Sequence, residues 1–201
     1  MSRRALISVY DKEGVDAFAR SLSELGWELV SSGGTASFLE EQGLEVTTVE
    51  DVTQAPEMLG GRVKTLHPRI HAGILARRDN PDDIATLAEH GIEPFDLVCI
   101  NLYPFERISA QRGITESEAV EMIDVGGPSM LRGAAKNFAH VAPVCRPERY
   151  GFVLDELRKN GELSLDTRRE LAAEAFATSA GYEAAIATWF SERETFPDTH
   201  V

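Results

Sequence analysis

Apolar and polar residues follow two alternating patterns along the first two thirds of the chain. Short runs that are apolar nearly throughout indicate strands buried on both faces, and stretches with apolar residues every three or four positions indicate helices. The predicted strands are residues 5–10, 28–32, 46–49, 96–102 and 141–145. The predicted helices in this part are residues 15–25, 35–42, 82–90, 116–123 and 128–137. This alternation predicts an α/β fold, with a mostly parallel, Rossmann-like sheet covered by helices on both faces.

Beyond residue 146 the pattern is helical only, over residues 147–159 and 165–190. The segment from Asp166 to Ala177 is rich in strong helix formers. No internal repeat, low-complexity tract or long linker interrupts the chain. We therefore predict a single domain over residues 1–201, with a core of about residues 1–146 and a helical C-terminal extension of about residues 147–192.

Charge and composition narrow the range of partners. The 201 residues carry a formal net charge of −13, which argues against nucleic acid and against an anionic membrane surface as general partners. No apolar run approaches the roughly 20 residues needed to span a bilayer, and the N-terminal segment lacks the pattern of a signal peptide. Cys99 and Cys145 both lie in apolar segments, which favours buried, reduced thiols in a cytoplasmic protein over a disulfide.

One segment departs from the acidic balance. Residues 58–78 contain no Asp or Glu but hold five cations, Arg62, Lys64, Arg69, Arg77 and Arg78. A local positive field in a negative molecule favours capture of a compact anion, although a solvated basic loop is the alternative. Gly60 and Gly61 favour a phosphate site, as does the order Arg62-Val63-Lys64, because both cations would project the same way from an extended backbone.

Two further glycine pairs stand at predicted helix starts. Ser31-Ser32-Gly33-Gly34-Thr35 combines hydroxyls with backbone N–H groups that could bind a phosphate, and a plain strand-to-helix turn is the alternative. It matches neither the dinucleotide nor the Walker spacing. Before Gly126-Gly127, Asp124 could move a proton while backbone N–H groups stabilise an oxyanion; equally, it could cap the helix.

Three other residues are candidates by position. Lys136 follows Asp124 by twelve residues, after small residues that would let its helix pack closely and point the lysine inward, although an exposed lysine is the usual case. Asn101 and Tyr103 lie at the carboxyl end of the strand 96–102, the edge where open α/β sheets bind ligands. A packed tyrosine with a satisfied hydroxyl is the alternative for Tyr103.

The sequence gives little support for a metal site or for a Ser/His/Asp catalytic triad. His67 and His71 have a spacing that could bind metal on a helix, but Pro68 argues against a helix there and no Cys or carboxylate is near in sequence. We predict no metal site. The Gly-x-Ser-x-Gly elbow of serine hydrolases is missing.

Taken together, these motifs resemble the IMP cyclohydrolase domain of the bifunctional AICAR transformylase/IMP cyclohydrolase family. The resemblance runs almost end to end and is carried by residues 7–14, 31–35, 56–68, 71–77, 101–105, 123–127 and 131–137. It implies a methylglyoxal-synthase-like fold and the last step of de novo purine biosynthesis. In that step, formylated AICAR (FAICAR) closes its ring with loss of water to give IMP. No cofactor or metal is implied.

The resemblance also implies roles for individual residues. Those implied in catalysis are Lys64, Tyr103, Asp124 and Lys136, with Asp124, steered by Lys136, handling the amide proton. Those implied in substrate binding are Ser8, Lys12, Ser32, Gly33, Gly34, Thr35, Arg62, Thr65, Asn101, Gly126 and Gly127. Tyr10 departs from the family pattern, where a small residue is expected.

The family is a multifunctional enzyme, active as a homodimer, that continues into a transformylase domain. Here we expect either a part of such a protein or a stand-alone cyclohydrolase. Two rival functions share the fold: a methylglyoxal-synthase-type lyase and a regulatory module that binds a nucleotide. Neither needs the joint presence of Lys64, Tyr103, Asp124 and Lys136, which favours the cyclohydrolase.

Overall fold

The sheet at the centre of the molecule is parallel throughout its described strands. The computed structural model describes residues 3–56, 58–102, 105, 107 and 113–192. Within them a five-stranded sheet has the order β3-β2-β1-β4-β5. The strands are β1 (Arg3–Ile7), β2 (Trp27–Ser31), β3 (Thr47–Thr48), β4 (Leu97–Cys99) and β5 (Ala142–Val144). The predicted α/β fold class is confirmed.

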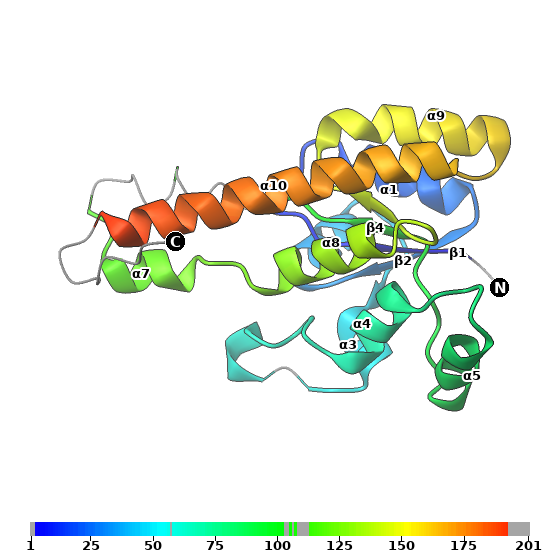
Figure 1. Ribbon diagram of the computed structural model, residues 1–201, viewed down its shortest axis with the longest axis horizontal. Coiled ribbons are helices and arrows are strands. Elements are labelled where there is room, and N and C mark those ends of the chain that lie inside the picture. The colour runs from blue at the N-terminus through cyan, green and yellow to red at the C-terminus, as the bar shows by residue number, and fades with distance from the viewer. Residues whose placement is uncertain (1–2, 57, 103–104, 106, 108–112, 193–201) are drawn as a thin grey trace.

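Helices cover both faces of this sheet (Figure 1). They are α1 (Val15–Glu24), α2 (Gly33–Glu41), α3 (Val49–Thr53), α4 (Pro68–Leu75), α5 (Pro81–Glu89), α7 (Glu116–Glu121), α8 (Gly126–Lys136), α9 (Tyr150–Asn160) and α10 (Leu165–Ser191). Short 3-10 turns occupy Leu59–Gly61 and Pro147–Arg149. The loop after β1 and the chain after β4 diverge to opposite sides, so the sheet has its switch point between these two strands.

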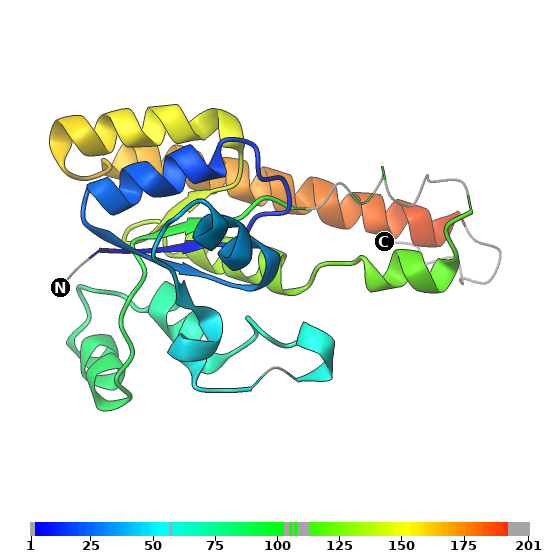
Figure 2. The same ribbon diagram turned by 180° about the vertical axis from the view of Figure 1, so that it is seen from behind.

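Alternation along the central strand divides the core into two halves. Ala5 and Ile7 face one half, with α1, α2 and α9, whereas Leu6 faces the other, with α3, α4, α8 and α10. Figure 2 shows α1 and α9 side by side on the first face, and the two helices are in contact. Both faces of β1 are therefore buried from Ala5 to Ile7, which explains why these three positions are all apolar.

The helices after residue 146 are part of both core halves. Tyr150, Leu154 and Leu157 of α9 pack in the first half, and Ala172 and Ala175 of α10 pack in the second. The segment that we predicted as a C-terminal extension thus covers the sheet on both faces. Both cysteines are free and buried, as predicted. No helix among the described residues is long and apolar enough to cross a membrane.

The far half of α10 continues past the sheet (Figure 1). There Tyr182, Ile186 and Trp189 pack with Phe105 and with Ala119 of α7 in a third apolar cluster. The rings of Trp189 and Phe105 meet edge to face, with 5.5 Å between their centroids. We call α7 and the part of α10 from Tyr182 to Ser191 the arm.

Two local predictions about residues 59–75 are wrong. Pro68 does not exclude a helix but begins one: His67 is the N-cap of α4, and its Nδ1 accepts a hydrogen bond from the backbone N–H of Arg69 at 3.2 Å. Residues 62–65 form turns instead of an extended segment. The backbone N–H of Lys64 donates to the carbonyl of Gly61, so the simple strand alternation of side chains does not apply.

Candidate active site at the carboxyl edge of the sheet

Loops that follow β1, β2 and β4 meet at the carboxyl edge of the sheet. Ser8 follows β1, is half-buried, and donates its backbone N–H to the carbonyl of Cys99 at 2.9 Å. Ser32 follows β2, and Asn101 lies just beyond β4. Because this edge is where the connections diverge, it is the place where open α/β folds bind ligands.

Thr35 and Lys12 join the first two loops into a cradle. The Thr35 hydroxyl donates to the carbonyl of Val9 at 2.9 Å and accepts from the Val9 N–H at 3.1 Å. Lys12 Nζ donates to the same carbonyl at 2.8 Å and lies 3.5 Å from Thr35 Oγ1. Partial burial lowers the pKa of Lys12, and the nearby Asp11 carboxylate partly opposes this. An anion bound here would interact with the Lys12 ammonium group, which has already lost part of its hydration.

The N-terminus of α2 opens into this cradle. Gly33 and Gly34 are its first residues and are exposed, and Ser32 is its N-cap without a side-chain capping bond. The first N–H groups of a helix have no partner within the helix. Lys64 Nζ stands over them, since a Cβ built on Gly33 would lie 3.9 Å from it. Backbone N–H groups and ammonium groups therefore converge as an anion site requires.

The two cations Arg62 and Lys64 point to different partners. Lys64 Nζ lies 2.5 Å from Glu50 Oε1 of α3, and the lysine side chain is 18% exposed. Arg62 Nη2 lies 3.0 Å from Glu121 Oε2 of α7, where both side chains are more than 60% exposed. The prediction that both cations project the same way is wrong, because the backbone between them turns.

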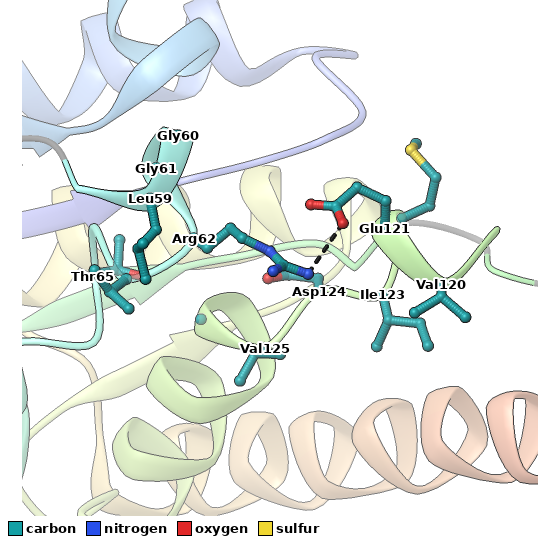
Figure 3. A pocket seen from close by; sticks show the side chains of 13 residues that line it. Leu59, Gly60, Gly61, Arg62, Thr65, Val120, Glu121, Ile123, Asp124 and Val125 are labelled. Carbon is teal, nitrogen blue, oxygen red and sulfur yellow. Dashed lines mark hydrogen bonds and ion pairs between the residues drawn. The ribbon is translucent and has the colours of Figure 1, made fainter. Parts of the chain in front are cut away.

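Next to the cradle is an open pocket of about 780 Å³. It lies between the segment 59–65 and the segment 120–126 at the start of α8, with the Arg62–Glu121 pair across it (Figure 3). Thr65 contributes the hydroxyl nearest to α8, and a Cβ on Gly126 would collide with its Oγ1. The consecutive residues Lys64 and Thr65 thus reach the α2 and α8 N-termini, respectively, and connect the cradle to the pocket.

Asp124 lines this pocket and also caps α8. Its Oδ1 accepts the backbone N–H of Gly127 at 3.0 Å, and a Cβ on Gly127 would overlap the carboxylate. Its own backbone N–H donates to the hydroxyl of Tyr182 at 2.7 Å. The carboxylate is therefore held at the helix N-terminus and also lines the pocket, so the capping hydrogen bond is present and the proton-transfer role stays a prediction.

Asn101 braces the loops. Its Oδ1 accepts the backbone N–H groups of Tyr10 at 2.6 Å and Asp11 at 3.0 Å, and its Nδ2 donates to the carbonyl of Asp11 at 2.8 Å. The side chain thus ties the β1 loop to the end of β4. Tyr10, the departure from the family pattern, is 53% exposed. Tyr103 lies outside the described residues.

Lys136 lies away from the other candidates. It is the last residue of α8 and is exposed. It stands ten positions after Gly126 in the helix, which corresponds to about 15 Å along the axis. The prediction that Lys136 points inward is wrong. Within one chain, Lys136 and Asp124 lie at opposite ends of α8.

Three residues near the site were not predicted from the sequence, Glu50, Glu121 and Tyr182, and His71 was considered only as a metal ligand. Burial lowers the pKa of His71, and its hydrogen bond with the backbone of Thr65 partly opposes this, so the imidazole supports the segment 62–67. The described residues hold no group of three or more His, Cys, Asp or Glu placed to bind a metal ion.

Comparison with known proteins gives two consecutive family matches. Residues 14–129 match the MGS-like domain, and residues 134–201 match the AICARFT/IMPCHase bienzyme. Since the first match covers more than half of the chain, the chain belongs to the MGS-like domain family. The resemblance seen in the sequence motifs is confirmed.

Individual relatives agree with this assignment. The bifunctional purine biosynthesis protein PurH of Leuconostoc mesenteroides is 54% identical over 195 residues, covering 97% of this chain and 38% of the relative. PurH of a Cyanothece species is 57% identical over 192 residues, covering 94% of this chain and 37% of the relative. The chain thus spans little more than a third of these curated relatives. The crystal structure of ForH superposes with a TM-score of 0.85 at 40% identity, covering 94% of this chain and 100% of that chain.

Proposed function

We propose that the chain is an IMP cyclohydrolase of purine biosynthesis, which closes the ring of FAICAR with loss of water to give IMP. The observation that carries this proposal is the joining of an anion cradle to an Asp124-lined pocket by the residues Lys64 and Thr65. The substrate is a nucleoside monophosphate and needs both parts. The PurH relatives and the match to the AICARFT/IMPCHase bienzyme support the same reaction.

The phosphate of the nucleotide is assigned to the cradle. Its ligands in this proposal are the side chains and backbone N–H groups of Ser8, Lys12, Ser32, Gly33, Gly34 and Thr35. Lys64 stands at the same helix N-terminus. Arg62 can contact the phosphate only if its ion pair with Glu121 breaks. Because an exposed ion pair of this kind contributes about 0–1 kcal/mol, breaking it costs little free energy.

The reacting groups are assigned to the pocket beside Thr65, Gly126 and Gly127. There the carboxamide nitrogen attacks the formyl carbon and a carbon–nitrogen bond forms. Holding the two groups together supplies several kcal/mol of the barrier, up to about 7–11 in the best-oriented reactions. Asp124 accepts the amide proton, while Lys64 and the backbone N–H of Gly126 at the start of α8 stabilise the oxyanion. The former formyl oxygen then leaves as water: its carbon–oxygen bond breaks as a carbon–nitrogen double bond forms to the formamide nitrogen, and the oxygen takes up the carboxamide proton and the proton of that nitrogen.

Asn101 supports this arrangement by bracing the β1 loop. Tyr103 belongs to it by resemblance alone. Lys136 has no contact with Asp124 within one chain, so we assign the proton step to Asp124 without it. We also propose, from the family resemblance, that the protein works in the cytoplasm as a homodimer and receives FAICAR from a transformylase.

Asp124→Asn tests the assignment. It keeps the oxygen that accepts the Gly127 N–H but removes the base, so kcat should fall about 10²–10⁴-fold while KM stays within a few-fold. The measurement is IMP formation from FAICAR, followed by ultraviolet absorbance. Asp155→Asn, an exposed change on α9, serves as the control with unchanged kinetics.

Two outcomes would count against the proposal. Near-normal turnover by Asp124→Asn would remove Asp124 from the proton step. If the unaltered chain binds FAICAR without forming IMP, the regulatory nucleotide-binding module becomes the better assignment; formation of methylglyoxal from a triose phosphate would favour the lyase.

A further inference from the structure

We propose that Tyr182 of α10 is a positioning residue that holds Asp124 in its reactive orientation. This inference rests on the proposed function, because it assigns a role in the same reaction. Tyr182 is distant from Asp124 in sequence and lies on the helix that crosses from the sheet to the arm.

The contact itself is direct. The hydroxyl oxygen of Tyr182 accepts the backbone N–H of Asp124 over 2.7 Å. Burial raises the pKa of Tyr182, so the hydroxyl remains neutral throughout the physiological range. This N–H lies outside α8, which begins at Gly126, so no hydrogen bond of the helix holds it. The tyrosine therefore supplies a partner at the point where the chain enters the pocket wall.

Packing holds the tyrosine in place. The side chain is 7% exposed and belongs to the apolar cluster of the arm, with Phe105, Ala119, Ile186 and Trp189. A ring enclosed in this way has little freedom to turn, so its hydroxyl is a fixed point. In Figure 3, α10 passes below α8 while Asp124 lies beside the pocket wall.

The two ends of Asp124 are thereby fixed by different elements. Its backbone N–H is held by α10, and its carboxylate is held by the Gly127 N–H of α8. With both bonds made, the direction of the carboxylate toward the pocket is determined. If the hydrogen bond to Tyr182 is lost, residues 122–125, which line the pocket, can rotate about the remaining bond between Asp124 and Gly127. Displacement of a reacting group by about 1 Å can cost about 10²-fold in rate.

Tyr182→Phe is the test, and Tyr150→Phe is its matched control. Both tyrosines are 7% exposed. The Tyr150 hydroxyl contacts Cys99 Sγ at 3.5 Å in the core half on the opposite face of the sheet. We expect Tyr182→Phe to lower kcat by about 10–100-fold with KM within a few-fold. Tyr150→Phe should leave both values near those of the unaltered protein.

A double-mutant cycle separates positioning from general damage. If Tyr182 acts through the Asp124 carboxylate, adding Tyr182→Phe to Asp124→Asn should lower kcat little further. A full additional loss would overturn the proposal, and so would normal kcat in Tyr182→Phe alone.

Amide hydrogen exchange, followed by NMR, makes the test independent of the assay. The Asp124 N–H should exchange faster in Tyr182→Phe than in Tyr150→Phe; equal exchange would overturn the proposal. If the unaltered chain forms no IMP, the proposed function fails by itself, whereas the exchange rates still decide whether Tyr182 holds Asp124.

Discussion

Gly126 and Gly127 are required by close approach, not by their backbone angles. Both are helical residues at the start of α8, and neither has a positive φ. A Cβ would collide with Thr65 Oγ1 at the first position and with the Asp124 carboxylate at the second. The sequence motif was therefore correctly placed at a helix start, but the reason for its glycines lies in two side chains, one from the same motif and one from the distant residue Thr65.

Gly126→Ala should destabilise the protein by about 1–3 kcal/mol, as overpacking of a close contact does. Thr65→Ala removes the colliding oxygen, so the double variant should regain most of that loss. Denaturant unfolding of the single and double variants provides the measurement.

Gly34→Ala is the matched control, because nothing lies within 4 Å of a Cβ at that helix start. If Gly126→Ala were as stable as Gly34→Ala, or if Thr65→Ala gave no recovery, the contact would not be the reason for the glycine.

Among the elements, α5 shows how a side chain joins a helix to the chain before it. Asp83 of α5 accepts the backbone N–H and the Nε of Arg77 through Oδ2, both at 2.9 Å. Its Oδ1 accepts Nη2 of the same arginine at 2.9 Å. These bonds lower the pKa of Asp83 to about 2.

Because the folded pKa lies below the unfolded one, this carboxylate stabilises the fold above the unfolded pKa of about 4. That contribution is lost as the pH falls toward 2. The difference in unfolding free energy between the unaltered protein and Asp83→Asn should thus be largest near neutral pH and shrink between about pH 4 and 2. Denaturant titrations across this range would measure it. A difference that did not change with pH would contradict the assigned cause.

Element positions were predictable where periodicity carries the information. The five predicted strands and the helices equivalent to α1, α2, α5, α7, α8, α9 and α10 are present, with ends shifted by a few residues. Among the described residues, two α-helices were missed. α3 is five residues long and depends on the Thr48–Asp51 capping box, and α4 begins with a histidine cap, which is an uncommon start signal.

At the scale of the whole molecule, the predicted site residues converge only in part. Motif chemistry identified Thr35 and Asp124, because a hydroxyl and a carboxylate stand next to glycine-rich helix starts, whereas Lys12 and Thr65 were implied only by the family resemblance. Glu50, Glu121 and Tyr182 carry no such local signal, since their roles depend on tertiary packing. The prediction that Lys136 points inward was wrong, because Lys136 is the last residue of α8 and lies at the end away from Asp124.

The C-terminal helices should be necessary for folding. A chain that ends after Arg146 lacks α9 and α10, which bury Leu154, Leu157 and Leu171 against one core half and Ala172 and Ala175 against the other. We expect this shortened chain to show no cooperative thermal transition by circular dichroism, whereas residues 1–192 should melt cooperatively. A cooperative transition in the shortened chain would show that residues 1–146 are an independent core.

The central position of β1 has a consequence for how the protein is made. Ala5 pairs with Leu29 on one side and with Leu97 on the other, and α10 closes over the sheet later still. On the ribosome β1 must therefore wait for its second neighbour until about ninety further residues have been synthesised. Contacts so distant in sequence close slowly. The nascent chain thus exposes one edge of β1 until β4 has been made, and chaperone binding to residues 3–31 during translation would protect it.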